Sequence, residues 1–423
     1  MKRHVRRAIW ALLFLVVSAG LIGCGRSDGP PERIILIVVD TLRLDHVSPY
    51  GSAAATPNLQ RLADDGQVFS NAIASFHQTT MSMAALFTGR TPSLESGDSK
   101  HPLPWNGRSW CGMARFAADP EDSCIPQGLT TLAEDLKRAG YWTVGVASNP
   151  FLFRPAGYDQ GFDEWIEVAA DDPDEVRKVL KRQRSGIRVQ TAVDDVLGRI
   201  PDRPLFLYVH YMDAHDYDHR SRNYPEAVAR ADEHVGNLLH RLEAMGLLDA
   251  AVVFFTSDHG EILDEKFDGY RTQSHFGNPS FQPVLEIPLI VAPPRFEDTD
   301  ALIRSQDIAD LVRQVAGVEA EADPEPTVAR DEHFVGEMHF LTYRKGRYKS
   351  IFHRNRMGAP ALFDLDADPK ESVNLIGVER EVSVQHLTRI GELVEALATS
   401  QTGNRELSEE DRARLRALGY LDE

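Results

Sequence analysis

The chain has 423 residues, 42% of them hydrophobic, and its glycines and prolines are scattered without a low-complexity block. This length is sufficient for one large core with a smaller satellite domain. The formal net charge of -18 at pH 7 argues against a nucleic-acid partner.

The amino terminus has the pattern of an export signal. Four basic residues precede an uncharged stretch from Ala8 to Ile22, which is shorter than the ~20 residues of a comfortable membrane span. Small residues leading into Cys24 resemble a bacterial lipobox, so residues 1–23 are predicted to be a lipoprotein signal peptide and residues 24–32 a tether. We therefore expect an exported protein that is lipid-anchored at the bacterial membrane, facing the periplasm. Gly25 slightly favours the outer membrane, and a plain signal peptide with a chance cysteine is the alternative.

Two further cysteines, Cys111 and Cys124, form an even pair once Cys24 is acylated. In an oxidising compartment this count favours a disulfide between them, closing a Trp/Pro-rich loop. Two free buried thiols are the alternative.

Strand-like and helix-like segments alternate over the next part of the chain. The apolar runs of strand length are Ile34–Asp40, Trp142–Ala147, Leu205–His210, Ala251–Thr256 and Leu289–Ala292. The helical patterns, most of which end at a glycine, are a segment opened by Thr56-Pro57-Asn58, Ala84–Phe87, Thr130–Ala139 and Glu226–Met245. This alternation predicts an α/β fold, with a mostly parallel sheet sandwiched by helices.

The sequence pattern changes near Asp300, after which the predicted strands are short and polar. We predict one catalytic domain over residues 33–300 and a small C-terminal α+β subdomain. Its antiparallel sheet would span residues 301–377, and a charged helical tail would span residues 378–423.

Two of the apolar runs end abruptly in a carboxylate, at Asp40 and at Asp258. Since the carboxyl ends of buried parallel strands open onto the ligand-binding crevice, these carboxylates should converge. His259 directly follows Asp258, and oxygen and imidazole ligands at one spot suit a single divalent cation, either calcium, manganese or zinc. The alternative is that each aspartate has only a structural role at the edge of the core, where backbone amides donate to its carboxylate.

Thr79 stands immediately before the helical run Ala84–Phe87 and is a fourth candidate ligand. A hydroxyl there is most simply a helix cap. The same position also offers a substrate anion the free amides and the positive end of a helix.

At this point the residues resemble the sulfatases, which are members of the alkaline phosphatase superfamily. The resemblance covers nearly the whole mature chain in the right order. It rests on the motifs Val38–His46, Tyr50-Gly51, Thr56–Leu59, Ala84–Arg90, Leu132–Glu134, Ala139–Tyr141, Gly161–Asp163, Thr256–Glu261, Leu362–Pro369, Asn374-Leu375 and Leu415–Leu421.

The resemblance implies an alkaline-phosphatase-like fold and a metal-dependent esterase. It implies that Thr79 is the nucleophile and that Asp40, Asp258 and His259, with Thr79, hold the cation. A threonine hydroxyl is a poor nucleophile until a metal stabilises its alkoxide, so the chemistry agrees.

The resemblance also implies groups that contact the substrate. His215 corresponds to a histidine that faces the leaving group, and His275 to a second substrate-binding histidine. Arg43 and Gln78 are expected to contact the substrate anion. The alternative for His215 is a loop histidine satisfied by a neighbouring aspartate.

The sequence also departs from the family pattern. Sulfatases carry a cysteine or serine that is oxidised to formylglycine, followed two residues on by proline and four on by arginine. The corresponding positions here hold Thr79, Met81 and Met83. The family also usually has two adjacent acids after the first strand, whereas here Asp40 is followed by Thr41. Threonine cannot become that aldehyde, so the usual route of sulfate release is closed.

Three functions fit these observations. The first is hydrolysis of sulfuric or phosphoric esters, including phosphodiesters and phosphonates, in a small molecule or a glycan. The second is transfer of a phosphoryl group, although members of that branch usually have several transmembrane helices. The third is a degenerate, non-catalytic binding protein. In each case the membrane would be contacted through the lipid anchor only.

Overall fold

The computed structural model describes most of the chain from residue 29 to residue 400. The described residues are 29–52, 55–91, 125, 130–168, 185–217, 223–267, 275, 280–319, 328–336, 340–353 and 359–400. The predictions for Cys24, Cys111, Cys124 and the signal peptide lie outside these residues.

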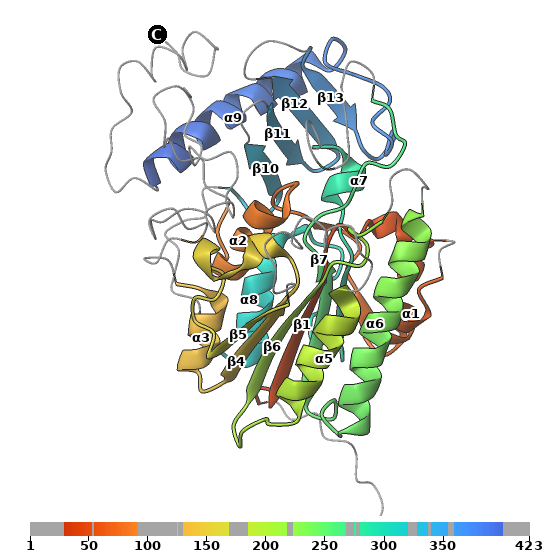
Figure 1. The fold of residues 1–423 in the computed structure, drawn as a ribbon. Coiled ribbons are helices and arrows are strands. Elements are labelled where there is room, and N and C mark those ends of the chain that lie inside the picture. The colour runs from red at the N-terminus through yellow and green to blue at the C-terminus, as the bar shows by residue number, and fades with distance from the viewer. Residues whose placement is uncertain are drawn as a thin grey trace, which may run out of the picture. The chain divides into compact units, whose positions relative to one another are not determined.

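A seven-stranded sheet forms the centre of the fold, in the order β2-β8-β7-β1-β6-β4-β5 (Figure 1). Strands β7, β1, β6, β4 and β5 run parallel, whereas β8 is antiparallel to β7 and β2 is antiparallel to β8. The strands are β1 (Arg33–Val39), β2 (Gln67–Val68), β4 (Trp142–Ala147), β5 (Glu164–Glu167), β6 (Leu205–Tyr211), β7 (Ala251–Ser257) and β8 (Leu289–Ala292).

Helices cover both faces of this sheet. One face packs against α2 (Thr79–Thr88), α3 (Leu132–Arg138) and α8 (Ser305–Ala316), and the other against α1 (Pro57–Asp64), α5 (Ser185–Leu197) and α6 (Tyr224–Ala244). The central strands β1, β6 and β7 are almost entirely buried, which is why they appear in the sequence as continuous apolar runs. The predicted mostly parallel sheet with helices on both faces is confirmed.

Some elements differ from the sequence expectation. Strands β4 and β8 have the predicted bounds, but α2 begins at Thr79, five residues before the predicted run. Helices α5 and α8 were not predicted. Helix α8 follows residue 300 and packs with α2 and α3 in the core of the large sheet.

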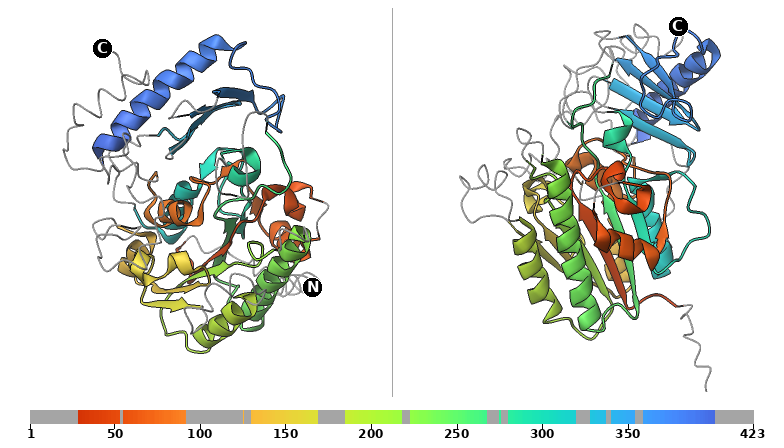
Figure 2. Two further views of the ribbon diagram at one scale, coloured as in Figure 1. Left: turned by 45° about the horizontal axis from the view of Figure 1, so that its top comes forward. Right: turned by 90° about the vertical axis from the view of Figure 1, so that its right-hand side faces the viewer.

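A second sheet follows in the C-terminal part, with four antiparallel strands in the order β10-β11-β12-β13. Figure 2 shows α9 lying along this sheet, and Ile390, Leu393 and Val394 of α9 pack against it. The small C-terminal antiparallel subdomain is thus confirmed. Its elements are β10 (Glu332–Gly336), β11 (Phe340–Lys345), β12 (Tyr348–His353), β13 (Ala361–Asp364) and α9 (Arg380–Ser400).

Short elements connect these layers. They are the pair β3 (Ala72–Ile73) and β9 (Ile303–Arg304), helix α7 (Gln282–Leu285), and 3-10 turns at Leu44–His46, Ser48–Tyr50, Pro150–Leu152 and Arg154–Ala156. Among the described helices, none combines the length and the apolar character needed to cross a membrane.

Candidate functional site

The register of the central strands brings two carboxylates together at the carboxyl edge of the sheet. Val39, the last residue of β1, is paired with Ser257, the last residue of β7. The next residue on each strand is Asp40 and Asp258 respectively, so both aspartates leave the sheet at the same level. Neither side chain is exposed to solvent.

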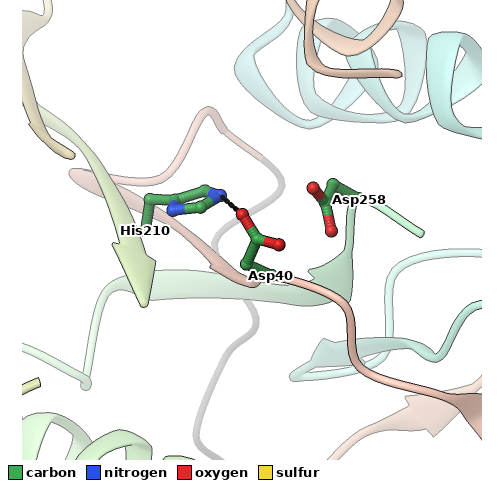
Figure 3. A group of neighbouring side chains, drawn as sticks. All are labelled: Asp40, His210 and Asp258. Atoms are coloured by element: carbon green, nitrogen blue, oxygen red, sulfur yellow. Dashed lines mark ion pairs between the residues drawn. The ribbon is translucent and has the colours of Figure 1, made fainter. Parts of the chain in front are cut away.

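His210 joins the two aspartates from the other neighbour of β1. It lies near the end of β6, paired with Val38, and its Nε2 lies 3.6 Å from Oδ2 of Asp40. Figure 3 shows Asp40 between His210 and Asp258. One ligand atom from each of these three buried residues lies within 4.8 Å of the others.

Thr41, two residues after the end of β1, bonds to both carboxylates. Oδ1 of Asp258 accepts hydrogen bonds from the amides of Thr41 (2.9 Å) and His259 (2.8 Å). Thr41 has a φ of 61°, a left-handed conformation that is strained for a β-branched residue, and its hydroxyl donates to Oδ1 of Asp40 at 2.5 Å. The second oxygen of each carboxylate is therefore the one left for the site.

Thr79 is the first residue of α2, and the helix carries it to this edge of the sheet. Its Oγ1 lies 3.4 Å from Oδ2 of Asp40 and 3.3 Å from Nε2 of His259. The amide of Asn149 donates to Oδ2 of Asp40 at 2.7 Å and lies 3.5 Å from the Thr79 hydroxyl. Ser82, one turn into α2, donates to the carbonyl of Asp258 at 2.6 Å and so ties the helix to β7.

The ring of His259 is oriented by its own chain. Nδ1 lies 2.8 Å from the carbonyl of Gly260, so it carries the proton, and the lone pair of Nε2 faces Thr79 and Asp258. Burial alone would lower the pKa of His259, but Asp258 and Asp40 raise it above its usual value.

The two carboxyls have opposite pKa shifts. Burial would raise the pKa of Asp40, but His215, His210 and His259 hold it well below its ordinary value. Burial, followed by the charge of Asp40, raises the pKa of Asp258. Two buried carboxylates this close repel each other unless a positive charge lies between them.

These residues fit a divalent cation. Oδ2 of Asp258 and both ring nitrogens of His210 are buried and make no hydrogen bond to the described residues. Buried polar atoms normally have a partner, and oxygen and imidazole donors suit calcium, manganese or zinc.

A row of imidazoles extends from this cluster. The ring of His275 lies 4.7 Å from that of His259 and 5.6 Å from that of His215. Glu261 accepts from Nδ1 of His275 at 3.1 Å. Burial and then the charge of His259 lower the pKa of His275 well below its usual value, so this ring is neutral at pH 7.

Arg43 lies beside the site but is held by acids. Its guanidinium donates twice to Asp45, at 2.9 and 2.7 Å, and once to Glu265 at 2.6 Å. The side chain is only 5% exposed. Gln78, the other predicted anion contact, precedes α2 in an extended conformation, and its carbonyl accepts from the amide of Ser82.

The sequence reasoning assigned no role to His210 or Asn149. His210 was predicted only to be the last residue of a strand, and the catalytic histidine of that segment was predicted to be His215. Asn149 follows β4 by two residues. The signal for both was the one that identified Asp40 and Asp258, namely a polar residue at the carboxyl end of a buried parallel strand.

The chain has relatives among known proteins. A family model described as Sulfatase matches residues 32–318, more than half of the chain. Human N-acetylgalactosamine-6-sulfatase is 28% identical over 283 residues, which cover 57% of this chain and 52% of that protein. The chain thus spans about half the length of the N-acetylgalactosamine-6-sulfatases that it matches.

Solved structures share the fold at low identity. A structure from work on glycosaminoglycan metabolism by Bacteroides thetaiotaomicron has a TM-score of 0.62 and 20% identity, covering 88% of this chain and 99% of its own. The phosphonate monoester hydrolase of Agrobacterium radiobacter has a TM-score of 0.59 and 15% identity, covering 90% of this chain and 98% of its own.

Proposed function

Because the chain belongs to the sulfatase family, we propose that it hydrolyses sulfuric or phosphoric esters with Thr79 as nucleophile and one divalent cation as cofactor. The main support is the position of the Thr79 hydroxyl, 3.4 Å from Asp40 and 3.3 Å from His259 at the start of α2. The alternative that Thr79 caps the helix is not supported, because Gln78 rather than Thr79 occupies the N-cap position of α2.

The residues that would hold the cation are Asp40, Asp258, His259 and His210. When bound, the cation would acidify the hydroxyl and offset the charge of the two carboxylates. Asn149 keeps Asp40 oriented, and the amides at the start of α2 can receive the non-bridging oxygens of the substrate.

The proposed reaction has two steps. In the first, the Thr79 hydroxyl releases its proton to water, and Oγ1 forms a bond to phosphorus or sulfur while the bond to the leaving oxygen breaks. His215 donates a proton to that oxygen. In the second, water gives one proton to the same imidazole while its oxygen attacks phosphorus or sulfur and the bond to Oγ1 breaks. This releases the acid, and Oγ1 takes up a proton from water, which restores the hydroxyl.

The charges around the site favour a substrate group with one negative charge. The positive charges that lower the pKa of Asp40 are those of imidazoles, and Arg43 is occupied by Asp45 and Glu265. Phosphodiesters, phosphonate monoesters and sulfate monoesters all fit. We favour phosphorus, because a threonine sulfate lacks the elimination route that a hydrated aldehyde provides.

A sulfated glycan is the second candidate substrate. It is favoured by the 28% identity with N-acetylgalactosamine-6-sulfatase, which acts on a sulfated sugar according to its name. The route through formylglycine would still be closed at Thr79.

The proposal is tested with the purified chain in manganese. We expect turnover of an aryl phosphodiester or phosphonate, loss of turnover in chelator and recovery when manganese is restored. Thr79→Ala should lower turnover on the order of 10³-fold or more, as expected for loss of a nucleophile. Acid quenching during turnover should give a mass increase on the peptide that contains Thr79.

Two variants serve as controls. Thr79→Ser keeps a hydroxyl and should retain activity, and Thr88→Ala alters a threonine at the far end of the same helix, where the hydroxyl donates to the carbonyl of Ala84 and accepts from the amide of Arg90. Full activity in Thr79→Ala would exclude the nucleophile. A chain that binds no metal and turns over neither phosphorus nor sulfate esters would be the binding protein instead.

We also propose that the chain is exported and anchored through a lipid on Cys24. The support is the lipobox-like sequence alone. Cys24→Ser should move the protein from the membrane fraction to the soluble fraction, whereas unchanged membrane retention would contradict the anchor.

A further inference from the structure

A buried ion pair lies in the C-terminal subdomain. Nζ of Lys349, on β12, donates to Oε1 of Glu371 at 2.5 Å, and the two side chains are 1% and 0% exposed. Glu371 has a φ of 53°, a left-handed backbone conformation that is unusual for a residue with a side chain. A buried charge pair on a strained backbone is costly, so its surroundings must hold it in place.

Both members of the pair bind the first residue of α7. Oε2 of Glu371 accepts from the backbone amide of Gln282 at 2.7 Å, and Nζ of Lys349 donates to the side-chain oxygen of Gln282 at 3.1 Å. The Lys349 ammonium also lies 5.7 Å from the centre of the Phe281 ring. The pair therefore fixes the start of α7 from the side of the C-terminal sheet.

An apolar cluster surrounds this contact. Phe281 and Val284 of the α7 segment pack with Ile351 of β12 and Phe363 of β13. Ile262 and Phe267, which follow the aspartate and histidine after β7, belong to the same cluster. The cluster thus joins three segments that are distant in sequence.

Helix α7 in turn holds the turn after β7, defined here as residues Asp258–Glu261. The amide of Gly260 donates to the carbonyl of Val284 at 2.7 Å, and the amide of Glu261 donates to that of Pro283 at 3.1 Å. The fit is tight, because a Cβ on Gly260 would lie 2.1 Å from the Pro283 oxygen. Any shift of α7 must therefore move this turn.

We propose that Lys349 and Glu371 are positioning residues that hold the Asp258–Glu261 turn in place through α7, so that the C-terminal sheet helps to build the cation site. The link to metal binding rests on the function proposed above, whereas the link to the turn does not. Replacing both members of a buried pair by neutral groups is often tolerated by the fold, which makes the proposal testable.

Two double variants separate the effect of the Lys349–Glu371 charges from the effect of the hydrogen bond between Glu371 and the Gln282 amide. Lys349→Met with Glu371→Gln removes both charges but leaves an oxygen that can accept from the Gln282 amide. Lys349→Met with Glu371→Met removes that acceptor as well. Arg389→Met with Glu332→Gln is the control, since it neutralises a charge pair of the same subdomain, between α9 and β10.

The first readout is hydrogen exchange at the amides of Gly260 and Glu261, measured without metal. We expect exchange at least tenfold faster in the Met/Met variant, a smaller acceleration in the Met/Gln variant, which of the bonds to α7 loses only the one from Lys349 to Gln282, and near wild-type rates in the control. Equal acceleration in β1 would mean that only global stability had changed, and that result would overturn the proposal. Unchanged exchange at the turn would also overturn it.

The second readout is manganese affinity of the folded protein. The Met/Met variant should bind at least tenfold more weakly than the wild type and the control, and equal affinity in all three would contradict a positioning role at the cation site. If the wild-type chain binds no manganese, the proposed cation site fails, and hydrogen exchange still decides whether the pair holds the turn.

Discussion

At the scale of single residues, His210 gives the sharpest test of the ligand set. Its ring is buried, both nitrogens lack a hydrogen bond among the described residues, and Nε2 lies 3.6 Å from Asp40. His210→Ala should weaken manganese binding by roughly 10- to 100-fold, whether the ring binds the ion directly or supports Asp40. Calorimetric titration measures this.

The matched control for His210 is Tyr208→Phe. Tyr208 lies two residues earlier on the same face of β6, and its buried hydroxyl likewise makes no hydrogen bond to the described residues. Its loss should leave the affinity unchanged. Equal weakening in both variants would assign the effect to packing of the strand.

From the sequence, site residues could be predicted only where they directly follow a recognisable buried strand. Asp40 and Asp258 end long apolar runs, and the register places them side by side. Arg43 shows the limit. Its partner Glu265 is 222 positions away, so only the folded chain reveals that the guanidinium is already bound.

At the scale of elements, the turn after β7 gives a second prediction. Gly260→Ala places a methyl group 2.1 Å from a backbone oxygen of α7, which cannot rotate away. This overpacking should lower the free energy of unfolding by about 1–3 kcal/mol in urea denaturation. Gly198→Ala is the control, because a Cβ at that position would lie 3.5 Å from its nearest neighbours, which is an ordinary contact. Equal stability of the two variants would argue against a tight α7 contact.

Helix α2 shows why element bounds were harder to predict than element types. Its first turn, Thr79–Ser82, contains β-branched and hydroxyl residues that are weak helix formers. Contacts from elsewhere stabilise it, including the bond from Ser82 to Asp258 and the burial of Met81 in the core. Tertiary contacts therefore extend the helix to the residue proposed as the nucleophile.

At the scale of the whole molecule, His333 makes stability depend on pH. It lies on β10, fully buried, and its Nε2 lies 2.8 Å from the carbonyl of Ala74, next to β3. Burial lowers the pKa of His333 to about 3. Between pH 6.5 and 3 the unfolded chain binds a proton here that the folded chain does not, so stability falls as the pH falls.

The size of this effect can be measured against a variant. At pH 5, about 1.5 units below the usual histidine pKa, the loss from His333 is about 2 kcal/mol. His333→Gln should flatten the fall in the free energy of unfolding between pH 7 and 5 by that amount. His240→Gln, at an exposed position, should not. Parallel curves for wild type and His333→Gln would contradict the prediction.

The alternation of strands and helices was sufficient to predict the parallel sheet and its helical faces. The packing of the C-terminal sheet was not predictable, because it depends on hydrogen bonds such as those of Lys349 with Glu371 and of His333 with Ala74. These contacts join distant segments and follow no periodic pattern in the sequence.

The presence of threonine at position 79 has a practical consequence. An aldehyde nucleophile must be made after translation by a dedicated enzyme, whereas a hydroxyl is complete when the ribosome releases the chain. Under the proposed function, cell-free synthesis in a mixture supplemented only with a metal salt would therefore yield a working catalyst, without any maturation partner.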